Sequence, residues 1–170
     1  YNSSLILGLQ CLLFIGYHLF TDYSSEASGI IEGDINDVSN VSNDINQYYP
    51  FFQDVHVMIF IGFGYLMTYL KEYSFTSVGY TFLIGAFLIQ YSILMNGLIH
   101  NIINNHYGKI LLSIKSLITG DFAAGSVLIS YGALLGKVSL HQLFLISIIE
   151  IIIYSLNESI GVTYYQAVDM

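Results

Sequence analysis

The first candidates for chemistry are carboxyl groups that stand inside apolar sequence. Glu150 has isoleucine on both sides, at positions 148, 149, 151 and 152. An ionisable group in such surroundings is costly, so it has either a partner on a neighbouring helix or a role in a pore or proton relay. In the first interpretation the carboxyl group is protonated or hydrogen-bonded. Both interpretations stay open from the residues alone.

Two further acids lie at the ends of apolar segments. Glu158 follows Glu150 by eight residues. It is either a solvated helix end or a carboxylate that concentrates cations at a channel mouth. Asp121 precedes Phe122 at the start of another apolar segment. We expect Asp121 to cap a helix N-terminus, where its carboxylate can accept from free N–H groups.

No set of side chains for enzymatic chemistry can be assembled from the sequence. No two histidines have the spacing of metal ligands on one helix, and a single cysteine, Cys11, allows neither a disulfide within the chain nor a zinc cluster. The histidines are His18, His56, His100, His106 and His141. We therefore expect no enzyme, no cofactor and no metal site.

The composition indicates a bilayer as the surrounding solvent. Of 170 residues, 55% are apolar and 9% are charged, whereas a soluble domain has about a quarter charged. That balance also excludes disorder. The net charge of −8, with four lysines and no arginine, leaves no basic face for a nucleic acid.

Apolar runs predict five membrane-embedded helices, so the expected fold class is all-α, a polytopic helical membrane protein. A helix rises 1.5 Å per residue, and about 20 residues cross the hydrocarbon. The first run has no base before Leu5 and a poor cleavage site, which favours a span over a signal peptide. The expected segments are about residues 4–20, 55–70, 78–100, 117–136 and 138–156.

The chain divides into three parts on this view. Residues 1–21 form the first transmembrane helix, and residues 22–54 form an acidic extracellular loop with an aromatic lead-in. Residues 55–170 hold four further helices and end at the start of the next one. The loop is expected to run to residue 47, and the sequon at Asn40 predicts a glycan on its outside.

The side of the membrane on which each connection lies is inferred from the expected outside position of that loop. Lys71 and Lys137 fall on one side of the membrane, and Lys109 and Lys115 fall on the side of the loop. Two lysines against two leave the positive-inside rule undecided. Six glycines inside the spans predict close approach of helices, as in channels and transporters. They are Gly62, Gly64, Gly85, Gly125, Gly132 and Gly136.

One long segment carries a family resemblance. Residues 49–68 read YPFFQDVHVM, then IFI, then GFGYLMT, and this run resembles the second-span signature of Rh glycoproteins in the ammonium transporter/Rh superfamily. The similarity continues at Asp121-Phe122 and from Gly132 to Ser139, and it ends at Asn157-Glu158 and Asp169. It covers about residues 49–169.

The resemblance implies a fold and a function. Family members have eleven or twelve helices with an inverted repeat, assemble as trimers, and carry in each subunit a pore for ammonia or ammonium, with carbon dioxide for some members. This chain would then be an N-terminal fragment that does not conduct alone, since Glu150 and Asp169 would lack their partners in lipid. It would lie in the plasma membrane or an internal membrane.

The resemblance also assigns roles to three side chains. Phe122 matches a pore-gate phenylalanine, whose ring face attracts a cation while excluding water. Glu158 matches an acid of the outer vestibule, and Asp169 matches a buried aspartate that organises the pore. The implied mechanism is recruitment at an acidic mouth, gating at Phe122, loss of a proton and passage of neutral ammonia.

Two departures from the family pattern matter. The chain has no tryptophan, so the outer-site tryptophan of the microbial branch has no counterpart, which favours the Rh branch. The family's pore histidine, eight residues after the aspartate matched by Asp169, does not fall within the chain. The alternative is therefore a truncated or diverged Rh-like partner subunit without transport activity.

Overall fold

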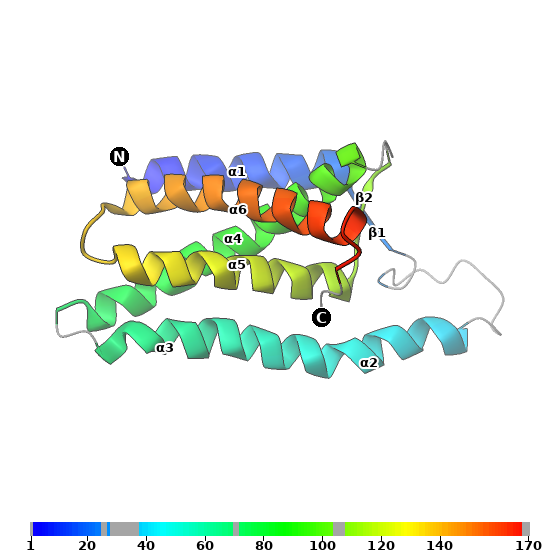
Figure 1. Cartoon of the computed structure of the whole chain (residues 1–170), viewed down its shortest axis with the longest axis horizontal. Coiled ribbons are helices and arrows are strands. Elements are labelled where there is room, and N and C mark those ends of the chain that lie inside the picture. Colours follow the sequence, from blue (N-terminus) through cyan, green and yellow to red (C-terminus); the bar gives the residue numbers. More distant parts are fainter. Residues whose placement is uncertain (1, 25–26, 28–37, 70–71, 104–107, 168–170) are drawn as a thin grey trace.

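The computed structural model describes residues 2–24, 27, 38–69, 72–103 and 108–167. Within these ranges the chain forms helical rods that run along one common direction (Figure 1). Their bounds are α1 Asn2–Phe20, α2 Val38–Val57, η1 Met58–Phe63, α3 Gly64–Leu66, η2 Met67–Tyr69, α4 Ser74–Ile103, α5 Ile114–Leu134 and α6 Leu140–Thr163. The segments α2, η1, α3 and η2 follow one another as a single rod.

The lengths of these helices confirm a polytopic helical membrane protein. Four helical stretches are long and apolar enough to cross a membrane, and a fifth, Ser4–Phe20 in α1, is apolar but shorter. Its 17 residues would cover about 25 Å. The four longer stretches are Gln47–Tyr69, Ser74–Ile103, Ile114–Leu134 and Leu140–Thr163.

The second rod starts earlier than the sequence analysis expects. Helix α2 begins at Val38, so the prediction of a loop through residue 47 is wrong from residue 38 onward. The serines, asparagines and aspartates there obscured a helical pattern of apolar residues spaced by three or four. That pattern is Val38, Val41, Ile45, Tyr49 and Phe52. Pro50 lies inside the helix and, having no N–H, leaves out one backbone hydrogen bond.

The same rod contains a wide turn in its middle. Met58–Phe63 is a π-helical segment, in which hydrogen bonds join residues five apart and one extra residue enters the turn. Segments of this kind inside α-helices frequently accompany functional sites. Ile59, on this segment, is 1% exposed and faces α5.

A short strand pair joins two distant parts of the chain. Strand β1, Thr21–Tyr23, runs parallel to β2, Ile110–Leu112, with Thr21 opposite Ile110. Beside it, Lys109 Nζ lies 3.2 Å from Asp22 Oδ2. This bond, with the N–H of Tyr23, lowers the pKa of Asp22. The sequence analysis predicted no strand, because three-residue strands give no alternating pattern.

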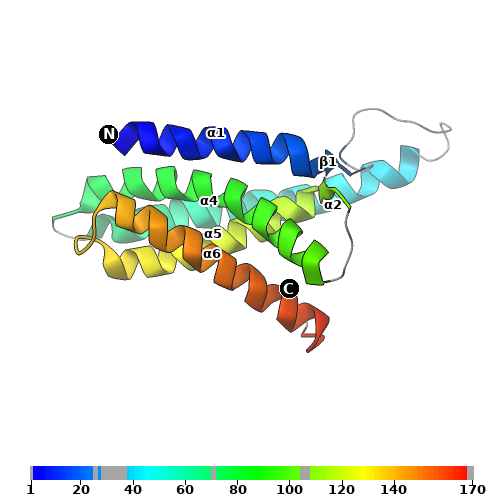
Figure 2. The same ribbon diagram turned by 90° about the horizontal axis from the view of Figure 1, so that it is seen from above.

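The strand pair marks one end of the bundle, which we call the strand end. Helices α1, α4 and α6 end there, and α2 and α5 begin there (Figures 1 and 2). Lys109 and Lys115 lie at this end, since Lys109 pairs with Asp22 and Lys115 Nζ lies 4.6 Å from the Tyr48 ring centre. The predicted grouping of these lysines with the residue-22 connection is confirmed.

The helices α4, α5 and α6 form the core. Its largest fully buried apolar side chains are Ile84, Leu88, Val127, Leu128 and Ile151. Helix α1 packs on α4, where the Gln10 Nε2 donates to Gln90 Oε1 at 2.6 Å and the Tyr17 hydroxyl donates to the Gln90 carbonyl at 2.7 Å. Polar contacts of this kind hold helices together where lipid replaces water.

Glycine allows close approach at one contact between α5 and the π segment. A Cβ on Gly125 would lie 2.8 Å from Ile59 Cδ1, and real Cβ atoms essentially never come that near. The expectation of close approach of helices also holds for Gly85 and Gly132. Gly136 lies beyond the end of α5, and its neighbour Tyr73 precedes α4, so this contact joins two connections and not two helices. The expectation is wrong for Gly62 and Gly64, where an added Cβ would meet nothing nearer than 3.8 Å.

We predict that Gly125→Val destabilises the bundle, because the added methyl groups push Ile59 and the π segment away from α5. Overpacking of this kind costs about 1–3 kcal/mol, which thermal unfolding in detergent would report as a lowered midpoint. Gly79→Val is the matched control, since a Cβ at Gly79 meets nothing within 4 Å. Equal midpoints for the two variants would contradict the prediction.

Candidate functional site

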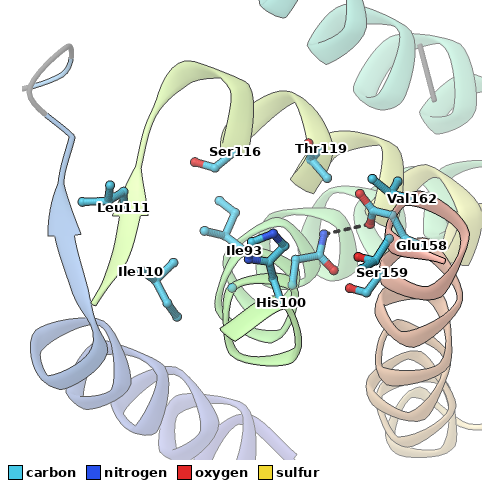
Figure 3. Close-up of a pocket in the computed structure, with 12 residues that line it drawn as sticks. Ile93, His100, Ile110, Leu111, Ser116, Thr119, Glu158, Ser159 and Val162 are labelled. Atoms are coloured by element: carbon cyan, nitrogen blue, oxygen red, sulfur yellow. Dashed lines mark hydrogen bonds between the residues drawn. The ribbon is translucent and has the colours of Figure 1, made fainter. Parts of the chain in front are cut away.

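Two cavities lie side by side toward the strand end. The first, which we call the polar cavity, has a volume of about 300 Å³ and lies between α4, β2, α5 and α6 (Figure 3). Seven of its twelve lining residues have polar side chains. The polar members are Asn96, His100, Ser116, Thr119, Glu158, Ser159 and Thr163.

The second, which we call the aromatic cavity, is larger, at about 540 Å³. Phe51 of α2, Phe63 of η1, Phe122 of α5 and Tyr154 of α6 supply its rings. The cavity therefore depends on the π segment, which supplies Met58 and Ile59 as well as Phe63.

The two cavities share a wall made of Thr119, Glu158 and Val162. Glu158 is half-buried there, and among the described residues that line either cavity it is the acidic one. Its Oε2 accepts from Asn96 Nδ2 at 3.2 Å (Figure 3). Phe122 and Glu158, which the sequence analysis selected, thus line one cavity.

Asp121 has a different place from the one expected. Helix α5 begins at Ile114, and Ser113 caps it by accepting from Ser116 N–H, so the prediction that Asp121 caps a helix is wrong. Asp121 lies inside the helix and is fully buried. Its Oδ2 lies 3.0 Å from Nδ1 of His56, a residue of α2. The Asp121 side chain therefore links α5 to α2 instead of capping the N-terminus of a helix.

His56 stands in a row of rings along the second rod. Its ring centre lies 5.2 Å from that of Phe52 and 4.6 Å from that of Phe60, and Phe60 stacks on Phe82 of α4 at 5.4 Å. The His56 side chain is 43% exposed. It thus reaches Asp121 from the edge of the bundle, and its position is set by rings on both sides.

Glu150 lies away from both cavities. Its Oε1 accepts from the hydroxyl of Ser130 on α5 at 2.6 Å. This is a contact of the kind that the first interpretation of Glu150 describes, a hydrogen bond to a neighbouring helix. Glu150 and Glu158 therefore have different partners on different helices.

The remaining candidates lie at the limits of what the structure describes. Asp169 is outside the described residues. Asn40 lies in α2, and its side chain is outside the described part. Within the described ranges, no group of three or more His, Cys, Asp or Glu side chains could hold a metal ion.

Sequence reasoning missed two contributors to this site, Asn96 and Thr119. Asn96 is a polar residue in the apolar segment 78–100, so the rule that applied to Glu150 could have found it. Thr119 carried no such signal, because a threonine in a membrane helix normally donates to its own backbone, as this one does to the Lys115 carbonyl at 3.1 Å.

Comparison with known proteins places these residues in a family. The model of the Ammonium Transporter Family matches residues 13–160. The chain is 45% identical to Ammonium transporter Rh type B of Rattus norvegicus, over 94% of this chain and 35% of that protein. It is 46% identical to Rh type B-B of Xenopus laevis, over 99% and 38%, and 41% identical to Rh type B of Danio rerio, over 95% and 34%. It spans about a third of their length.

We predict a marked asymmetry when the pair of His56 and Asp121 is broken. His56→Leu leaves a fully buried carboxylate unpaired and should lower the free energy of unfolding by about 3–5 kcal/mol. Asp121→Asn keeps a hydrogen-bonding group and should cost about 1–3 kcal/mol.

Unfolding in detergent measures both variants, and Asp121→Leu with the double variant completes the cycle. Since the double variant buries no unpaired carboxylate, it should lower the free energy of unfolding by less than the sum of the two single losses. Additive losses would show that the two side chains act independently.

Proposed function

Because the chain belongs to the ammonium transporter family, we propose that it forms part of a Rh-type membrane channel for ammonia or ammonium. It is a multi-pass integral membrane protein by its helices and its family. The observation that carries the proposal is the aromatic cavity, where Phe122 and Glu158 line one space.

The proposed mechanism follows from the charges and rings of that space. The carboxylate of Glu158 raises the local concentration of cations at the strand end. A cation beside it then meets the face of Phe122, which attracts positive charge. Beyond the ring, apolar walls such as Ile59 and Ile129 favour the neutral species, so ammonium gives up its proton to the solvent at the strand end and ammonia passes.

Other parts of the proposal rest on the family alone. We propose that Asp169 organises the pore near this mouth, that the complete protein is a homotrimer in the lipid bilayer, and that carbon dioxide is a further cargo. The alternative is a diverged Rh-like partner subunit that assembles with others and conducts nothing. It differs from a channel in one measurable property, the flux through vesicles.

We predict that Glu158→Gln lowers uptake of methylammonium, an ammonium substitute, by vesicles that hold the protein made from its complete coding sequence. Loss of one partly exposed charge is worth about 1 kcal/mol, so uptake below half-saturation should fall about fivefold. Phe122→Leu keeps an apolar side chain but removes the ring face, and should also lower uptake.

The control is Glu72→Gln, which removes the same charge from an exposed position beyond the second rod. Its uptake should match that of the unchanged protein. Uptake by the unchanged protein no faster than that of empty vesicles would favour the partner-subunit alternative. Equal losses in the Glu158 and Glu72 variants would remove Glu158 from the mechanism while leaving transport intact.

We also propose that the strand end faces the outside of the cell or the lumen. A glycan on Asn40 is then expected, because that residue belongs to α2 near its start at this end. Digestion with a glycosidase should increase the gel mobility of the protein, and Asn40→Gln should abolish the shift. A shift that persists in this variant would place the glycan elsewhere.

A further inference from the structure

In the polar cavity, one end of the Asn96 side-chain amide has a hydrogen-bond partner and the other end has none that the structure describes. Its Nδ2 donates to Glu158 Oε2, yet its Oδ1 is buried and has no hydrogen-bond partner in the described part of the chain. Leaving a buried acceptor unpaired costs free energy. An apolar residue of similar size would avoid that cost, so the bond to Glu158 is the interaction that distinguishes asparagine here.

Adhesion between α4 and α6 does not require this amide. The two helices already pack through apolar side chains, with the rings of Phe87 and Phe144 edge to face at 5.4 Å between centres and with Leu88 and Ile151 fully buried. The effect of the Asn96 bond is local. It fixes one oxygen of a carboxylate on the wall that the two cavities share.

Two hydroxyls in the wall of the polar cavity, Thr119 and Ser116, accept hydrogen bonds more readily than they donate them. The Thr119 hydroxyl donates to the Lys115 carbonyl at 3.1 Å, and the Ser116 hydroxyl donates to the Ser113 carbonyl at 2.7 Å. A hydroxyl has one hydrogen and two lone pairs. Both hydrogens are therefore engaged, and Ser116 Oγ, which also accepts from Ser113 N–H at 3.1 Å, keeps one lone pair for a further donor. A small cation with N–H groups suits such a wall.

We infer that Asn96 is a positioning residue, which fixes the orientation of the Glu158 carboxylate within the shared wall. That orientation favours the binding of cations with N–H groups. The inference rests on the proposed transport function and deepens it. Asn96 acts through Glu158, and Thr119 and Ser116 supply neutral acceptors around the same position. The selected class is ammonium and small primary ammonium ions, which can donate several hydrogen bonds.

The test measures methylammonium uptake against concentration in vesicles that hold the complete protein. We expect Asn96→Leu to raise KM three- to tenfold and to leave kcat within about twofold, since the bond affects capture of the cation. Asn96→Gln keeps an amide donor and should recover at least half of the loss in kcat/KM. Asn96→Ala serves if the leucine variant does not fold, with the same expected result.

Two further variants separate positioning from a structural effect. In Glu158→Gln protein, adding Asn96→Leu should change KM by less than twofold, because the target of the bond is already gone. The control is Asn101→Leu. Asn101 also lies on α4, but its Nδ2 donates to the Gly108 carbonyl at 2.8 Å and it does not line the polar cavity, so KM should stay unchanged.

The outcomes test this inference separately from the proposed transport function on which it rests. No uptake by the unchanged protein would overturn the proposed function. Normal uptake with an unchanged KM in Asn96→Leu would overturn the inference and leave the function standing. So would a loss that multiplies with that of Glu158→Gln, since Asn96 would then act independently of the carboxylate.

Discussion

The hydrogen bond between His56 and the buried carboxyl group of Asp121 determines how the second rod lies against the rest of the bundle. A fully buried carboxylate without a partner is costly, so α2 must be rotated to bring His56 to α5. The π segment begins two residues after His56. Its Ile59 then meets Gly125, its Phe63 faces the aromatic cavity, and Phe122 follows Asp121 directly. One polar contact thus positions both walls of that cavity.

The strand pair provides the second constraint. It ties the end of α1 to the connection between α4 and α5, and Ile110 of β2 enters the wall of the polar cavity. An exposed ion pair such as Lys109 with Asp22 contributes little stability by itself. Its place beside the backbone bonds of β1 and β2 is what matters, since together they hold Ile110 and Leu111 in the wall of the polar cavity.

The helices could be predicted from composition, because in a bilayer every backbone polar group must be satisfied within its own element. The residues of the site were harder to predict from the sequence. Phe122 was selected by resemblance alone. His56 and Asp121 were each noticed, but they are 65 residues apart, and no local pattern reports a pairing over that distance. The start of α2 was missed because polar residues between its apolar positions suggested a loop. The strands were too short to leave a pattern.

The two acids of α6 show how rotation about a helix axis gives two carboxyl groups of one helix different surroundings. Eight residues advance a helix by about 12 Å and leave a residual turn of about 80°. Glu150 therefore faces Ser130 of α5, while Glu158 faces Asn96 of α4 and the wall between the cavities. A hydroxyl partner inside the bundle suits a carboxyl group that only holds helices together. An amide partner at the edge of a space leaves room for a cation. Sequence reasoning separated the two acids by their place along the segment and by the resemblance at Glu158, whereas the structure separates them by the direction in which each points from α6.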